Sequence, residues 1–116
     1  MKVMPIRYSA DVDASIRFYE ALGLKVSTES RSKQWAELSS ASNGVVALHI
    51  AQPGEAGACE LSFETQEPLE KVVTRLTEAG FAPDQIVDEN FGRSVRVQDP
   101  DAVWVQINEH DRELYA

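Results

Sequence analysis

The sequence predicts an α+β fold in which two βαβββ modules form a single domain over residues 1–116. Segments of alternating polar and apolar residues, typical of strands, flank two segments whose apolar residues recur at helical spacing. SIRFYEALGL at Ser15–Leu24 resembles VVTRLTEAGF at Val72–Phe81, an offset of 57 residues. A Gly-, Pro- and Ala-rich stretch at 51–58 separates the copies, which we place at about residues 1–52 and 58–110.

The first module opens with a strand at Lys2–Ser9, which Pro5 makes irregular or confines to an edge. Asp11 suits the N-cap of a helix over Asp11–Leu22, and Gly23 suits its end. Three strands follow, at Leu24–Thr28, Trp35–Ser39 and Val45–Ile50. In the last of them His49 shares a face with Val45 and Ala47, because side chains alternate along a strand.

The second module repeats this order with a strand at Cys59–Thr65 and a helix at Pro68–Ala79, with Pro68 in the first turn and Gly80 at the end. A weak strand pattern at Phe81–Val87 precedes a hairpin over Phe91–Glu109. The turn Asp99–Ala102 joins the two hairpin strands, since Pro and Asp favour such turns. In the second strand the valines and isoleucine take one face and Trp104, Gln106 and Asn108 the other; His110–Ala116 reads as a polar tail.

This order predicts helices on the outer face of a curved sheet and a cavity on its concave face. Five further residues fall on the predicted concave side: Trp35, Glu37, Arg96, Trp104 and Asn108. Aromatic walls with a few polar groups are typical of a small-molecule pocket. The alternative for Trp104 is a subunit interface, which also favours aromatic residues. Short modules leave sheet edges that need pairing or cover, and this favours a homodimer.

The composition limits the classes of binding partner and the cellular location that we expect. A net charge of −8 argues against nucleic acid, whose phosphates need clustered Lys and Arg. The same charge permits a cationic ligand, although solubility alone also explains it. No apolar run reaches the roughly 20 residues that span a bilayer, and no leader pattern opens the chain. With Cys59 as the single cysteine, we expect a cytoplasmic protein without an internal disulfide.

Two motifs carry a family resemblance: ADVDASIRFYEALGL at Ala10–Leu24 and VQDPDAVWVQINE at Val97–Glu109. With the paired modules, the chain resembles over nearly its whole length the vicinal oxygen chelate superfamily. That superfamily includes glyoxalase I, fosfomycin- and bleomycin-resistance proteins and extradiol dioxygenases. The resemblance implies the fold strongly and the function weakly, because one fold hosts many chemistries.

The resemblance also implies where a metal would bind, since metal-dependent members take one pair of ligands from each module. The matching positions are Met4, His49, Glu60 and Gln106, and the 57-residue offset pairs His49 with Gln106. His, Glu and Gln can coordinate a divalent ion, whereas the thioether of Met4 is a poor ligand for hard cations. Each residue also has an interpretation without a metal. His49 is then an ordinary buried or surface histidine of a strand, Glu60 a solvated side chain and Gln106 a hydrogen-bonding amide. Ala102 also replaces the usual Gly of the turn.

Two functions stay open. The first is a metal-assisted lyase, isomerase or transferase in which His49, Glu60 and Gln106 hold Mg, Mn, Ni or Zn, and Glu60 doubles as the general base. An iron dioxygenase is disfavoured, because its triad needs two histidines and His110 lies outside the predicted strand. The second is a metal-free protein that binds and sequesters a small, antibiotic-like and cationic molecule, as bleomycin-resistance proteins do. Met4, Trp35 and Trp104 favour this binder.

Overall fold

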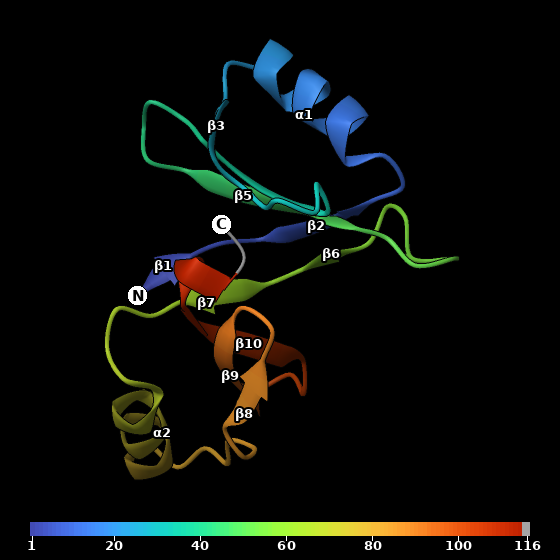
Figure 1. Cartoon of the computed structure of the whole chain (residues 1–116). Helices are drawn as coiled ribbons and strands as arrows, with labels where there is room; N and C mark the ends of the chain where they lie inside the picture. Colours follow the sequence, from blue (N-terminus) through green and yellow to red (C-terminus); the bar gives the residue numbers. More distant parts are fainter. Residues whose placement is uncertain (115–116) are drawn as a thin grey trace. The chain divides into compact units, whose positions relative to one another are not determined.

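The computed structural model describes residues 1–114, and the contacts within it divide the chain into two units. The N-terminal unit comprises residues 4–60, and the C-terminal unit comprises residues 1–3 and 61–114. Each unit holds one five-stranded sheet and one α-helix (Figure 1). Among the described residues, no helix has both the length and the apolar character needed to cross a membrane.

The N-terminal unit contains a mixed sheet with strand order β6-β2-β5-β4-β3. Strand β2 runs parallel to β5, while the other neighbours are antiparallel. Its elements are β2 (Ile6–Ser9), α1 (Val12–Ala21), β3 (Lys25–Glu29), β4 (Trp35–Ser39), β5 (Val45–Ile50) and β6 (Cys59–Glu60).

The C-terminal unit repeats this plan with strand order β1-β7-β10-β9-β8 and with β7 parallel to β10. The predicted α+β fold of two βαβββ modules is therefore confirmed. The elements are β1 (Lys2–Val3), β7 (Ser62–Glu64), α2 (Leu69–Glu78), β8 (Val87–Glu89), β9 (Gly92–Gln98), β10 (Trp104–His110) and the 3₁₀ helix η1 (Arg112–Leu114).

Two segments predicted as single strands are each divided between the two sheets. Lys2–Ser9 breaks at Pro5, so that β1 pairs with β7 and β2 pairs with β6. Proline has no N–H to donate to a ladder, and here its carbonyl accepts from the amide of Ala47 at 2.9 Å. Cys59–Thr65 breaks at Leu61 in the same way. Each unit thus gains a two-residue edge strand from the segment that leads into the other.

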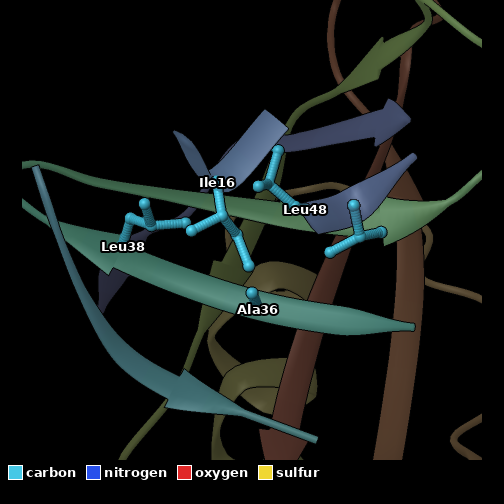
Figure 2. Close-up of a cluster of buried hydrophobic side chains, with 5 residues drawn as sticks. Ile16, Ala36, Leu38 and Leu48 are labelled. Carbon is cyan, nitrogen blue, oxygen red and sulfur yellow. The ribbon is translucent and has the colours of Figure 1, made fainter. Parts of the chain in front are cut away.

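Helix α1 begins as the sequence predicts. The side chain of Asp11 accepts a hydrogen bond from the amide of Ala14 at 3.0 Å, which satisfies an amide that lacks a partner in the helix. Ile16 then packs on Ala36, Leu38 and Leu48 of the sheet (Figure 2). Because strand side chains alternate, the residues next to these three on β4 and β5, such as Glu37 and His49, point away from the helix.

Helix α2 is capped from a distant strand. Pro68 precedes it and offers no side-chain hydrogen bond, but the carboxylate of Glu109 accepts from the amide of Leu69 at 3.1 Å. Arg93 holds Glu109 at 2.8 Å and Glu70 at 2.7 Å. Hydrogen bonding to Arg93 lowers the pKa of Glu70 to about 2 and also lowers the pKa of Glu109.

The β4–β5 and β9–β10 hairpins have matching turns. The amides of Ser40 and Asp99 donate to carbonyls four residues on, at 2.8 and 2.9 Å. Asn43 and Ala102 both adopt positive φ, 68° and 65°. These pairs lie 59 residues apart, two more than between the helices, so the constant offset of 57 predicted from the sequence is wrong in the hairpins.

Two smaller predictions in the C-terminal unit are also wrong. Phe81–Val87 is not a strand, since β8 is confined to Val87–Glu89. Pro83 lies in this stretch, where it has no amide hydrogen for a ladder. Strand β10 ends later than predicted and includes His110, which pairs with Gly92 and whose ring lies 5.1 Å from that of Phe91.

Replacing Ala102 by glycine should stabilise the protein. The left-handed backbone costs alanine about 1–2 kcal/mol, and glycine removes this strain. Part of the stabilisation is offset, because glycine loses more conformational entropy on folding than alanine does. We expect the free energy of unfolding to rise by about 0.5–1 kcal/mol, measured by urea denaturation. The matched control is Asn43→Gly, which should change it less because asparagine tolerates this conformation. A lower stability for Ala102→Gly would contradict this account.

Removing the guanidinium with Arg93→Met should lower the Tm at pH 7 and make the Tm depend less steeply on pH in the acid range. The pKa of Glu70 is depressed in the folded state, so its contribution is present above pH 4.5 and is lost as the pH falls toward 2. Wild type should therefore lose Tm more steeply than the variant between pH 5 and 2, followed by circular dichroism. Lys33→Met, which removes an exposed ion pair with Glu29, is the control and should leave the slope unchanged.

Candidate functional site

The sheet of the N-terminal unit presents three ring side chains on the face away from α1. Strand pairing places Tyr8 opposite His49 and His49 opposite Trp35, so one ring comes from each of β2, β5 and β4. The rings of Tyr8 and His49 are 5.3 Å apart and tilted by 52°. Trp35 meets His49 edge-on at 6.0 Å. All three are half-buried, which leaves part of each ring accessible to a ligand.

Tyr8 connects this row of rings to Glu60 on β6. Its hydroxyl donates to the Glu60 carboxylate at 3.1 Å. Burial raises the pKa of the Tyr8 phenol, and the neighbouring negative charge of Glu60 raises it further. The phenol therefore stays protonated at neutral pH and acts as a donor.

Trp35 is oriented by Glu37 on the same strand. The indole Nε1–H donates to the Glu37 carboxylate at 2.9 Å. Glu37 is only 1% exposed, so its carboxylate is buried beside the indole of Trp35. Two carboxylates, Glu37 on β4 and Glu60 on β6, thus each accept from an aromatic donor.

His49 has its tautomer defined by the backbone. Its Nδ1 lies 2.6 Å from the carbonyl oxygen of Ile50. A carbonyl can only accept, so we assign the proton to Nδ1 and the lone pair of the neutral ring to Nε2.

The C-terminal unit carries a second group of predicted site residues on the face away from α2. The guanidinium carbon of Arg96 lies 4.4 Å from the centre of a Trp104 ring. The Gln106 amide donates to the Asn108 side-chain oxygen at 2.8 Å. Asn108 is 2% exposed, whereas Trp104 is 43% exposed. The structure therefore joins the nine predicted site residues within two separate groups, one in each unit.

The predicted metal ligands depend on which residue of one module corresponds to which residue of the other, and the strand ladders change that correspondence. With the hairpins 59 residues apart, His49 corresponds to Asn108, and Gln106 corresponds to Ala47. Before the helices the spacing is 56, because Ser9 and Thr65 make the same turn, each bonded to the amide two residues on. That spacing keeps Met4 equivalent to Glu60. The predicted pairing of His49 with Gln106 is therefore wrong by two residues.

The equivalent positions do not form a fitting set for a metal. Met4 is fully buried and packs with Ile6 and Ala47 in an apolar cluster. If Glu60 and Gln106 mark the ligand positions of the second module, the first module has a thioether and a methyl group at the equivalent positions, and neither suits a hard cation. Within residues 1–114, no group of three or more His, Cys, Asp and Glu side chains is placed to hold a metal ion. The ligand set His49, Glu60 and Gln106 stays a prediction.

Tyr8 is the site residue that the sequence analysis missed. The family motifs direct attention to Met4 on the opening strand, while Tyr8 lies four residues further along. The usable signal was alternation, because residues 4, 6 and 8 share one face of a strand. Its partner across the ladder, His49, was already a candidate.

A family model described as the glyoxalase/bleomycin resistance protein/dioxygenase superfamily matches residues 4–107. A search of curated proteins found no significant match.

Solved structures show the same fold. A Vibrio splendidus 12B01 member of that superfamily is 19% identical over 91% of this chain and 96% of its own, with a TM-score of 0.60. A Legionella pneumophila protein described as an NAD-dependent benzaldehyde dehydrogenase is 18% identical over 94% and 99%, with a TM-score of 0.71. Homoprotocatechuate 2,3-dioxygenase from Brevibacterium fuscum is 19% identical over 99% of this chain but 40% of its own, with a TM-score of 0.58.

Proposed function

Because the chain belongs to the glyoxalase/bleomycin resistance protein/dioxygenase superfamily, we propose that it binds a small organic molecule on the ring-bearing face of its N-terminal unit. The observation that carries the proposal is the row formed by Tyr8, His49 and Trp35, with ring centres 5.3 and 6.0 Å apart. Binding without a metal is the function that this geometry supports best.

The polar groups around the rings support a binding role. Ligand sites combine apolar and aromatic walls with a few fixed polar groups that set orientation. Here Glu60 and Glu37 accept hydrogen bonds from Tyr8 and Trp35, so both the rings and the carboxylates are held in place before a ligand arrives. Such preorganisation lowers the entropy cost of binding.

The remaining predicted contacts differ in how they enter the proposal. Met4 is fully buried, so its proposed role is to pack against Tyr8 and Trp35 and support their rings rather than to touch the ligand. Arg96, Trp104 and Asn108 stay predicted ligand contacts of the C-terminal unit, and the site proposed on the N-terminal unit does not depend on them. Assembly as a homodimer is likewise part of the proposal.

A metal-assisted lyase, isomerase or transferase is the second candidate, and one observation favours it. Histidines that bind metals usually donate their other ring N–H to a carbonyl or carboxylate. His49 has this arrangement, with Nδ1 2.6 Å from the carbonyl of Ile50. Met4 and Ala47 argue against it, because a thioether and a methyl group do not suit a hard cation.

Ligand binding can be tested with a screen of small aromatic fragments, both neutral and charged, by ¹H–¹⁵N correlation spectra. We expect hits to shift the amides of Tyr8, Trp35 and His49. His49→Ala should weaken these hits about tenfold, the equivalent of one lost ring contact of about 1 kcal/mol or slightly more.

The matched control is Phe18→Ala, which removes an exposed ring on α1 and should leave the affinities unchanged. Circular dichroism should show that both variants fold. The proposal fails if the hits shift only amides outside β2, β4, β5 and β6, or if His49→Ala and Phe18→Ala behave alike.

Metal binding can be tested by calorimetric titration of the purified protein with Mg, Mn, Ni and Zn. We expect that none of these ions binds at the predicted ligands with a Kd below about 1 mM, because Met4 offers only a weak thioether donor and Ala47 offers none. Glu78→Ala on α2 is the control for loss of one exposed carboxylate. Uptake that is abolished in each of His49→Ala, Glu60→Ala and Gln106→Ala, with the fold intact, would establish the second candidate instead.

A further inference from the structure

Glu60 is a half-buried carboxylate that no basic side chain in the described part of the chain neutralises, in contrast to Glu64 and Glu109. Glu64 pairs with Arg112 at 3.0 Å and Glu109 pairs with Arg93 at 2.8 Å. Across residues 1–114, no Lys, Arg or His forms an ion pair with the half-buried Glu60, whose partner is the neutral hydroxyl of Tyr8. A charge taken partly out of water is costly unless an opposite charge compensates it.

The rings beside Glu60 offer the second half of a cation site. Tyr8 and Trp35 flank His49 at interplanar angles of 52° and 79°, so their faces are turned in different directions rather than stacked flat. The electron-rich face of an aromatic ring attracts a cation within about 6 Å, most strongly for tryptophan and for weakly hydrated organic cations. The Glu37 carboxylate, bonded to the indole N–H at 2.9 Å, adds further negative potential.

We infer that this face selects an organic cation, an ammonium or guanidinium group on an apolar body, with the charge beside Glu60 and the body against the rings of Tyr8 and Trp35. The inference rests on the proposed binding function and specifies its ligand class. An organic cation suits the face better than a small metal ion, because it sheds water readily and contacts rings as well as oxygen. The net charge of −8 also raises the local concentration of cations at any site on the chain.

The charge of Glu60 can be removed without losing its hydrogen bond. In Glu60→Gln the side-chain oxygen still accepts from the Tyr8 hydroxyl, so the rings keep their positions. Calorimetry of wild type should show that benzyltrimethylammonium binds more tightly than benzyl alcohol, a neutral probe with the same ring. In Glu60→Gln the affinity for the cation should fall about tenfold, while that for benzyl alcohol stays the same.

Glu78→Gln is the matched control, since it removes the same charge from the exposed surface of α2 and should leave both affinities unchanged. An equal loss in both Gln variants would reduce the effect to net charge and overturn the inference. Benzyl alcohol binding as tightly as the cation, with both weakened by His49→Ala, would overturn the choice of a cation but leave the proposed binding function standing. Failure of benzyltrimethylammonium to bind at 50 mM or less (roughly the weakest affinity calorimetry resolves) would also overturn it, while the fragment screen decides the binding function separately.

Discussion

The parallel pairing of β2 with β5 is the constraint on which the N-terminal unit depends. Its register sets Tyr8 opposite His49 and Arg7 opposite Leu48. Since side chains alternate, a slip of β5 by one residue would turn His49 toward α1 and move Leu48 to the opposite face. The packing of Ile16 on Leu48 therefore also fixes the face on which the rings lie. The core and the candidate site are two sides of one ladder.

The two units show how one backbone plan can carry different chemistry. Both have the same strand order, one parallel pair, one helix and the same five-residue hairpin loop. Yet the ladder position of His49 holds Asn108 in the other unit, and that of Glu37 holds Arg96. Backbone hydrogen bonds and an apolar helical face are enough to repeat the plan, so the polar face is free to differ.

Charge pairing is distributed unevenly in the same way. In the C-terminal unit, Arg93 pairs with Glu70 and Glu109, and Arg112 pairs with Glu64. Those pairs serve the structure, because Arg93 joins β9 to β10 and α2, and Arg112 joins η1 to β7. In the N-terminal unit, Glu60 has an uncharged partner instead. This difference is the basis for our proposal that Glu60 is available to a ligand.

The sequence by itself determined most of the local structure. The strands Trp35–Ser39 and Val45–Ile50, the Asp11 cap and the DPD turn follow from alternation, capping and turn chemistry, which act over a few residues. Only the tertiary structure decided that Pro5 and Leu61 divide their strands between two sheets, that Glu109 caps α2 across 40 residues, and that the hairpins lie 59 rather than 57 residues apart. It also brought Tyr8, absent from the family motifs, between His49 and Glu60. These features depend on which strand lies beside which, and local periodicity does not encode that choice because many partners satisfy the same alternation.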